Sequence, residues 1–511
     1  MENEPIISIV VPTHNRRASL KRTLDALCLQ TYPVEQMELL VVADGCTDET
    51  PSMLREYRAP FSLKSIEQPN QGAAAARNRG AEEANGTVLL FLDDDVEPTP
   101  RLVEAHARAH QHKLGQVVIG PYPLARKSHA DFFVLAQRAW WDAIFDAMGE
   151  TGHRFAFTDL LGGNFSIEPG LFVRVGRFSP AFRCHEDHEL GIRLLKAGAQ
   201  FFFAPDALGY HHEQDSLNCL LARKYQEGRA DVQIARLYPG IRAVLPLAHY
   251  RSAPAWLNRF LRILAFATPK IGDPLARCFQ HVLSFLENVR LRDSWKQLQD
   301  ALKDYWYWRG VAEEISRRTL TGLFDRNQVR SDVETPEVEL DLREGLDRAE
   351  SRLDEKRPDA IRICYAGRHV GFVFPQPGAE PLRGAHLRSI LTKTFAGPVL
   401  EAMVLLGNVD DFDTVERPKL AKLVRVRSSW FGQVRSGKAW SEQYAQWLRL
   451  EGRESEEPAL FWEQQARISH LENEKTGLSG QLNYWRYLAE EREKSIQKQQ
   501  LLISELERDK T

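Results

Sequence analysis

Three consecutive carboxylates, Asp93, Asp94 and Asp95, come directly after the apolar run 87–92. Adjacent negative charges repel one another, so this arrangement favours a cation among them. Mg²⁺ and Mn²⁺ prefer hard oxygen ligands and usually bind through one or two carboxylates together with substrate phosphates. The alternative is an acidic turn in contact with water. An apolar run of this length is typical of a buried parallel strand, and ligands of open α/β sheets bind at the carboxyl ends of such strands, which favours the metal.

The segments before this run predict the scaffold that holds the carboxylates. Residues 6–11 and 38–42 are apolar strand patterns followed by polar residues, and apolar residues recur at helical spacing over 19–29 between them. An alanine-rich segment, 73–84, predicts a second helix before the 87–92 strand. Strand, helix and strand in succession imply right-handed crossovers and a parallel sheet. We therefore expect an α/β fold whose polar strand ends share one edge.

Composition excludes several classes of protein. The chain has 511 residues, of which 43% are hydrophobic and 27% are charged, as in ordinary globular proteins of several domains. A net charge of -3 argues against a nucleic-acid partner. The six cysteines lack paired spacing, which suits reduced thiols better than disulfides or a zinc site. We find neither a signal-peptide pattern nor an apolar run long enough to span a membrane, and expect a cytoplasmic protein.

Several segments together carry a resemblance to a known family. In their order and spacing they resemble the family 2 glycosyltransferases, which have the A-type nucleotide-sugar-binding fold. The resemblance extends over about residues 5–215. The matching segments are 10–16 (Val-Val-Pro-Thr-His-Asn-Arg), 44–48 (Asp-Gly-Cys-Thr-Asp), 70–80, 92–95 (Leu-Asp-Asp-Asp), 161–167, 184–194 and 205–212.

The resemblance implies both a fold and a reaction. The fold is a Rossmann-like, mostly parallel sheet of the A-type. The reaction is transfer of a sugar from a nucleotide diphosphate sugar to a glycan or a lipid-linked glycan, with Mn²⁺ or Mg²⁺ as cofactor. By analogy with the family, the product belongs to a bacterial surface polysaccharide or glycolipid.

The resemblance also assigns the metal site. Asp95 would bind the cation directly, while Asp93 and Asp94 hold the ribose hydroxyls or metal-bound water. Asp93 also counts among the expected metal residues. His211 would complete the site from a later strand; the alternative is that it forms an ordinary surface pair with His212.

Further positions are expected to contact the nucleoside of the donor. By resemblance, Asp44 and Arg77 supply hydrogen-bond partners to the base. Thr13 and Asn15, in the loop after the first strand, are nucleoside contacts as well. For Arg77 the competing account is a structural salt bridge on its alanine-rich helix.

The acceptor hydroxyl must lose a proton as it attacks, so the reaction needs a carboxylate as general base. The adjacent acids Glu186 and Asp187 are the candidates, with Asp187 preferred because the family's base usually falls on the aspartate. A capping or salt-bridge role at a helix start is the alternative. One base without a separate nucleophile implies a single displacement with inversion at the sugar carbon.

The chain after the catalytic region divides into further parts. We expect a catalytic domain over 1–240, a helical region over 241–330, a small α+β domain of unknown role over 335–455 and a coiled coil over 460–511. The coil has an imperfect heptad repeat, and it would join a second copy or a partner enzyme. Its alternative is a single helix in water.

The helical region has two interpretations. It is either a bundle packed on the catalytic domain or a set of helices that lies on the cytoplasmic face of a membrane, near a lipid-linked acceptor. The second interpretation rests on basic residues that flank aromatic and leucine side chains: Arg251, Arg259, Arg262, Lys270 and Arg277.

Two other functions fit parts of the pattern. A nucleotidyltransferase could share the sheet, the carboxylates and the metal, although the 12–16 loop has no glycine with which to grip phosphates. A non-catalytic scaffold, in which the coil does the work, is the other alternative. The acidic residues that the chemistry requires are all present, which argues against a decayed enzyme.

Overall fold

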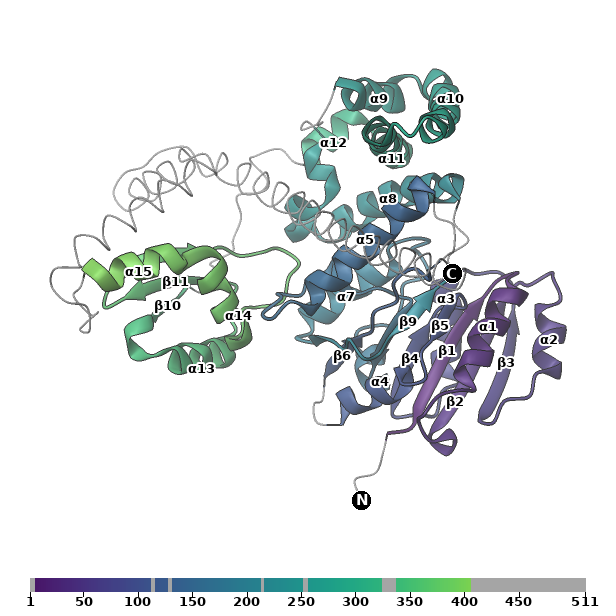
Figure 1. Cartoon of the computed structure of the whole chain (residues 1–511), viewed down its shortest axis with the longest axis horizontal. Coiled ribbons are helices and arrows are strands. Elements are labelled where there is room, and N and C mark those ends of the chain that lie inside the picture. Colours follow the sequence, from purple (N-terminus) through teal and green to yellow (C-terminus); the bar gives the residue numbers. More distant parts are fainter. Residues whose placement is uncertain are drawn as a thin grey trace, which may run out of the picture.

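A seven-stranded sheet of order β3-β2-β1-β4-β7-β6-β8 forms the centre of the catalytic half. The structure is a computed structural model and describes residues 5–111, 115–126, 131–212, 216–250, 256–323 and 337–405. Only β7 runs antiparallel to its neighbours. The mostly parallel α/β sheet and the helical region after it confirm the predicted fold class (Figure 1). The strands are β1 Ile7–Thr13, β2 Met37–Asp44, β3 Ser62–Gln68, β4 Val88–Leu92, β6 Gln116–Ile119, β7 Asn164–Ile167 and β8 Gln200–Phe203.

Helices surround this sheet, and a two-stranded ribbon lies beside it. The ribbon pairs β5 (Val96–Pro98) with β9 (Gly209–His211) in antiparallel fashion. The helices are α1 Arg17–Leu27, α2 Thr50–Glu56, α3 Ala73–Glu82, α4 Leu102–His110, α5 Phe132–Gly149, α6 Pro169–Arg174 and α7 Glu186–Lys196.

Small residues let α3 lie close to the sheet. Ala74, Ala76 and Gly80 are buried on this helix. A Cβ atom added at Gly80 would overlap the side chain of Val10 on β1. The alanine-rich composition therefore brings the helix, and Arg77 with it, close to the strand ends.

In the described part of residues 216–323, the α-helices are α8 Leu217–Leu237, α9 Trp256–Ala267, α10 Pro269–Asn288, α11 Arg292–Glu314 and α12 Arg317–Leu323. α8 packs along α11, and the two share one apolar core with residues of the catalytic half such as Phe182 and Ile192. The boundary expected at residue 240 therefore falls inside the short helix Pro239–Val244, whose Ile241 belongs to the same core. Within the part of the chain that the structure describes, no helix is long and apolar enough to cross a membrane.

Two glycines allow the close approach of α8 and α11. A Cβ atom at Gly310 would overlap the carbonyl oxygen of Tyr225, and one at Gly228 would overlap the carbonyl oxygen of Tyr307. Both obstructing atoms are backbone, so neither can turn aside.

We expect Gly310→Ala to destabilise the protein strongly, because the two helices must separate to admit the methyl group. The cost should reach or exceed the upper end of the ~1–3 kcal/mol that overpacking typically costs. Thermal unfolding of the variant measures it. Gly322→Ala is the matched control, since this helical glycine has open space around its Cβ position. An equal fall in the melting temperatures of the two variants would contradict the account.

A small domain follows, with a three-stranded sheet of order β10-β11-β12. Its elements are β10 Glu337–Asp341, β11 Ala360–Tyr365, β12 Arg368–Val373, α13 Leu346–Lys356, α14 Gly384–Ile390 and α15 Ala396–Leu405, the last two joined by a π-helical turn over Leu391–Phe395. Residues 406–455 and the expected coil over 460–511 lie outside the described residues.

Backbone hydrogen bonds join the small domain to the catalytic half. The N–H of Phe157 donates to the carbonyl oxygen of Gly378 at 2.9 Å, and the N–H of Glu380 donates to that of Phe155 at 2.8 Å. Arg154 Nε also donates to the Glu380 carbonyl at 2.7 Å. The short helix Phe157–Asp159 in this segment packs against α7.

Candidate active site

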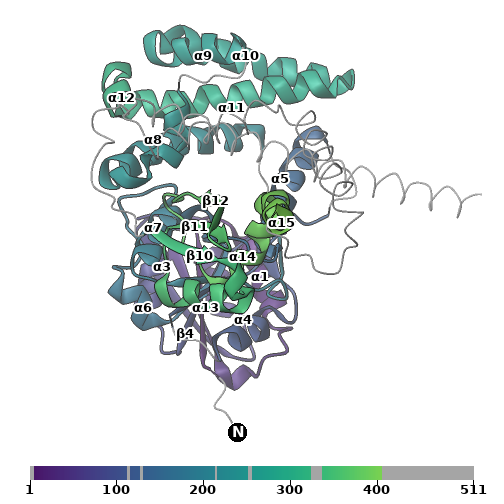
Figure 2. The same cartoon turned by 90° about the vertical axis from the view of Figure 1, so that its left-hand side faces the viewer.

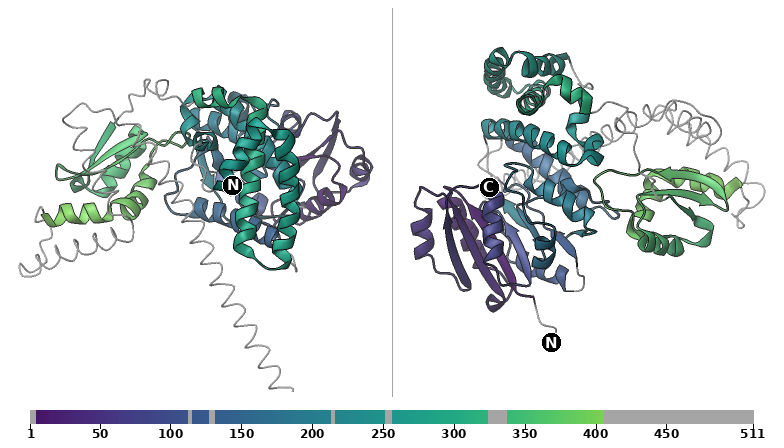
Figure 3. Two further views of the ribbon diagram at one scale, coloured as in Figure 1. Left: turned by 90° about the horizontal axis from the view of Figure 1, so that it is seen from above. Right: turned by 180° about the vertical axis from the view of Figure 1, so that it is seen from behind.

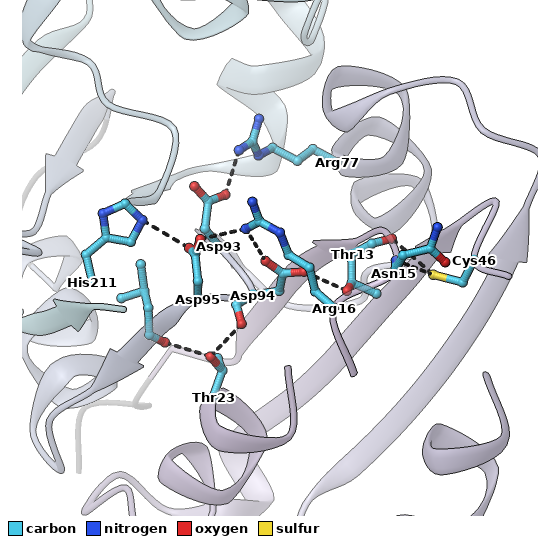
Figure 4. A network of polar contacts seen from close by, with 11 residues as sticks. Thr13, Asn15, Arg16, Thr23, Cys46, Arg77, Asp93, Asp94, Asp95 and His211 are labelled. Carbon is cyan, nitrogen blue, oxygen red and sulfur yellow. Dashed lines mark hydrogen bonds and ion pairs between the residues drawn. The ribbon is translucent and has the colours of Figure 1, made fainter. Parts of the chain in front are cut away.

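The three aspartates lie at the carboxyl end of β4. The positively charged side chain of Arg16 reaches them from the loop after β1 (Figure 4). Arg16 Nη1 lies 2.6 Å from Asp95 Oδ2 and 3.2 Å from Asp94 Oδ1. The hydroxyl of Thr13 donates to Asp94 Oδ2 at 2.6 Å. The mutual repulsion expected from the sequence is thus reduced in the protein itself by a guanidinium group.

Asp94 and Asp95 differ in the pKa of their carboxyl groups. Burial raises the pKa of Asp94 to about 7, and the neighbouring Asp95 adds to the rise while Arg16 opposes it. Burial also acts against the charge of Asp95, but His211 and Arg16 outweigh it and hold its pKa at about 2. Asp95 is therefore the carboxylate that stays ionised near neutral pH.

The ribbon of β5 and β9 brings His211 to the three aspartates Asp93, Asp94 and Asp95, here called the triad. Val96 pairs with His211 in the ribbon register, which places the histidine beside the segment that carries Asp95. His211 Nε2 lies 3.2 Å from Asp95 Oδ1. Edge contacts to the rings of Tyr122 and Trp141, with centroids 5.6 and 5.7 Å away, hold the imidazole in place.

A cation would find two protein ligands here. No group of three His, Cys, Asp or Glu side chains in the described ranges converges as a closed cage. Asp95 and His211 do face each other across a short gap, and one carboxylate with open positions for phosphate and water is the usual protein contribution to Mg²⁺ or Mn²⁺. The donor set therefore fits a divalent cation shared with a substrate.

The second acidic pair lies across the site from the triad, at the start of α7. Arg77 joins the two groups, because Nη2 lies 2.7 Å from Asp93 Oδ1 and Nη1 lies 2.9 Å from Glu186 Oε1. Asp187 Oδ2 accepts the N–H of Gly162 at 2.9 Å, and Asp187 Oδ1 accepts that of His188 at 2.8 Å.

The surroundings separate the pKa values of the two acids. Burial and the negative charge of Asp187 raise the pKa of Glu186, although Arg77 opposes the rise. Burial acts on Asp187 in the same direction, but His188 and the N–H of Gly162 outweigh it and lower its pKa. Asp187 is thus ionised at neutral pH, and the salt bridge to Arg77 occupies Glu186.

Of the four residues expected to contact the nucleoside, Asp44 and Asn15 lie on the β2 side of β1, whereas Thr13 and Arg77 bind the aspartates that follow β4. Asp44 accepts N–H groups from Gln71 and Gly72 at 2.8 and 2.7 Å. Asn15 Oδ1 accepts the N–H of Thr47 at 2.7 Å. These bonds shape the loops that would border a base, and nucleoside contact by these side chains stays a prediction.

Arg77 makes the kind of contact that the competing account describes. Both of its terminal nitrogens bind carboxylates, as a structural salt bridge requires, whereas a direct contact to the base was preferred from the sequence. Its nucleobase role stays a prediction.

Reasoning from the sequence missed three contributors to the site. Arg16 was assigned only to a polar loop, although the unbalanced charge of the triad was a signal for a nearby cation. Gly162 and Gly163 lie in the matching segment 161–167, but no role was predicted for them. A side chain on Gly163 would approach Tyr122 and Asp93 within 2.9 Å, so this loop needs its glycines to lie against the acids. Tyr122 itself is buried and gave no signal in the sequence.

A buried polar chain supports β7 beneath the site. His106 Nε2 donates to Asn164 Oδ1 at 2.9 Å, which leaves Nδ1 to accept the Ser166 hydroxyl at 2.8 Å. His110 Nε2 then donates to Ser166 Oγ at 2.8 Å. Asn164 Nδ2 also donates to the Ala207 carbonyl at 2.8 Å, so this asparagine of the 161–167 segment is part of the scaffold.

These histidines predict a loss of stability in acid. Burial lowers the pKa of His106 to about 3 and that of His110 to about 4. An unfolded histidine titrates near ~6.5, so below that pH the unfolded chain binds protons that the folded chain does not, and the free energy of unfolding falls. His106 alone should cost about 2 kcal/mol by pH 5.

Denaturant unfolding between pH 7.5 and pH 5 measures this loss. His106→Gln should reduce the dependence on pH, and replacement of the exposed His281 should leave it unchanged. Equal pH dependence in wild type and His106→Gln would contradict the assignment.

Comparisons with known proteins identify the family of the chain. The family model described as Glycosyl transferase family 2 matches residues 8–168. Glycosyltransferase AglE of Haloferax volcanii is 35% identical over 238 residues, which cover 45% of this chain and 74% of AglE. The chain belongs to glycosyltransferase family 2.

Other similarities of this family 2 chain are more local. Validoxylamine A glucosyltransferase of Streptomyces hygroscopicus subsp. jinggangensis is 41% identical over 108 residues, which are 21% of this chain and only 26% of that protein. Among solved structures, mannosyltransferase PcManGT from Pyrobaculum calidifontis, in complex with GDP-Man and Mn²⁺, has a TM-score of 0.42 and 18% identity, and the match covers 60% of this chain and 87% of that one.

Proposed function

We propose that the protein transfers a sugar from a nucleotide diphosphate sugar to a glycan or lipid-linked glycan, with help from a divalent cation. The observation that carries the proposal is the meeting of two acidic groups at one sheet edge. The triad offers an ionised Asp95 beside His211, and Arg77 joins Asp93 to the Glu186 and Asp187 pair. Such an edge can hold a charged leaving group and a base on opposite sides of a sugar.

The cation is expected to be Mn²⁺ or Mg²⁺, with Asp95 and His211 as its ligands and Asp93 beside them. When bound, it supplies positive charge that stabilises the diphosphate leaving group. The chain's own Arg16 and Arg77 add positive charge to the same region. Asp44, Thr13 and Asn15 are proposed to shape the nucleoside end.

Asp187 is proposed as the base that takes the proton of the acceptor hydroxyl. It is ionised, and it receives only backbone N–H groups in the hydrogen bonds described above, whereas Glu186 is held by Arg77. One base and no second nucleophile support direct displacement of the nucleoside diphosphate, with inversion at the sugar carbon. The acceptor is a bacterial surface glycan only by family analogy.

Incubation with a panel of nucleotide sugars and Mn²⁺ tests the reaction class. A transferase should slowly hydrolyse its own donor to nucleoside diphosphate and free sugar. A nucleotidyltransferase would instead need added pyrophosphate and would form nucleoside triphosphate and sugar 1-phosphate. A scaffold would consume no donor, and either of these two results would overturn the proposal.

A further inference from the structure

We propose that the outward face of α9 and α10, here called the outer face, binds the surface of an anionic lipid bilayer. Apolar side chains project from both helices. Trp256 is 77% exposed, Ile271 62% and Phe285 60%. Phe260, Ile263 and Val282 are exposed on the same two helices, and Val289 is exposed directly after α10. This inference concerns a different surface from the active site and does not depend on the proposed reaction.

Helical spacing places these side chains on one side of each helix. On α9, Trp256, Phe260 and Ile263 follow one another at intervals of four and three residues, which is one side of an α-helix. The opposite side of α9 is buried, with Leu261 and Ala265 in the core. α9 thus has two apolar sides. One is buried in the core of the protein, and the other is exposed on the outer face.

The position of the helices leaves the outer face open. α9 and α10 form the outermost layer, with α11 beneath them and α8 between α11 and the sheet, as two perpendicular views agree (Figures 1 and 2). Seen from above, the same helices lie nearest the viewer (Figure 3). The helices pack on the catalytic half, as the first interpretation of the helical region expects, and the exposed apolar layer is the feature that the second interpretation requires.

Charge is distributed unequally on this layer. Between residues 256 and 290, all of them described, four cations are exposed: Arg259, Lys270, Arg277 and Arg290. The acids of this stretch are Asp273 and Glu287, and both bind inward. Asp273 accepts the hydroxyl of Tyr305 at 2.5 Å, and Glu287 accepts the N–H of Phe132 at 2.7 Å.

This charge pattern selects a lipid over a second copy of the chain. In a twofold dimer the same patch meets itself, so the exposed cations of residues 256–290 would face one another, while the two acids of that stretch bind inward. Anionic phospholipid head groups offer the complementary charge, and the acyl region accepts the aromatic and aliphatic side chains. An apolar stripe with basic borders is the pattern of helices that lie in the membrane interface.

Sedimentation of the full-length protein with vesicles tests the proposal. The vesicles are phosphatidylcholine alone or phosphatidylcholine with roughly a third phosphatidylglycerol. We expect clear binding to the anionic vesicles. The double variant Trp256→Glu/Phe285→Glu should reduce partitioning by about tenfold or more, and Arg259→Glu/Arg277→Glu should abolish the preference for anionic lipid.

Matched controls separate this surface from general effects of charge. Leu29→Glu replaces another exposed apolar side chain, and Arg348→Glu reverses another exposed cation, both away from the outer face. Both should bind vesicles like the wild type. Absence of binding to anionic vesicles, or equal binding by all variants, would overturn the proposal. Light scattering that finds a wild-type dimer and a monomeric Trp256→Glu/Phe285→Glu variant would also overturn it and assign the face to a second copy.

Discussion

Replacing Asp95 by Ala is expected to reduce metal-stimulated transfer by on the order of 10²–10⁴-fold, because a metal acting as Lewis acid supplies several kcal/mol and each ~1.4 kcal/mol is a factor of ten. The structure gives the reason for choosing this residue. Asp95 has its pKa held at about 2 by His211 and Arg16 against the effect of burial, so it offers a full negative charge. The pKa of Asp94 is raised to about 7, so Asp94 carries only part of a negative charge near neutral pH.

Binding of Mn²⁺ to the protein, measured by electron paramagnetic resonance without donor, should weaken in parallel with the rate. The chain contains a matched control, because Glu97 lies 2.6 Å from His212 in a second acid–histidine pair two residues further along. Glu97→Ala should retain both metal binding and turnover. If Asp95→Ala bound Mn²⁺ as tightly as the wild type, or worked fully in excess chelator, the metal assignment would be wrong.

The second large effect is expected at the base. Asp187→Asn should lower the transfer rate by about 10²–10⁴-fold, as removal of a general base typically does, while donor affinity is preserved. Asparagine keeps one oxygen that can accept the N–H of either Gly162 or His188, and its amide group then faces the other N–H. A melting curve therefore has to show that the variant remains folded.

Calorimetry of donor binding separates chemistry from structure at this position. Glu186→Gln is the comparison, because it keeps an oxygen for Arg77 and loses only the charge. Its rate should fall less than that of Asp187→Asn. Equal loss of donor affinity in Asp187→Asn would make Asp187 structural, and a normal rate in that variant would transfer the role to Glu186.

The sequence was most informative where a local pattern decides the structure. β1, β2 and β4 are buried along nearly their whole length, so apolar runs marked them. β3 (Ser62–Gln68) lies at the sheet edge, and most of its residues are exposed or half-buried. It therefore has no apolar run from which a strand could be predicted. Local patterns thus predicted the central strands and missed the edge strand.

Contacts in the site depend on the arrangement of distant segments. The acids could be named individually, but the ion pair of Arg16 with Asp95 spans 79 positions and that of Arg77 with Glu186 spans 109. Which cation reaches which acid is set by strand order and by the close packing of α3. No spacing within the sequence encodes that choice.

The union of the small domain with the catalytic half bears on how the chain can be divided. A protein truncated near residue 330 would lack the backbone hydrogen-bond partners of Phe155 and Phe157, both of which are buried. Arg154 would lose the carbonyl oxygen that accepts its Nε–H. The exposed edge would lie beside the short helix Phe157–Asp159, which supports α7 and hence Asp187. The catalytic region that family membership outlines is therefore not a self-contained unit. Residues 376–383 supply the hydrogen-bond partners that its segment 154–157 requires.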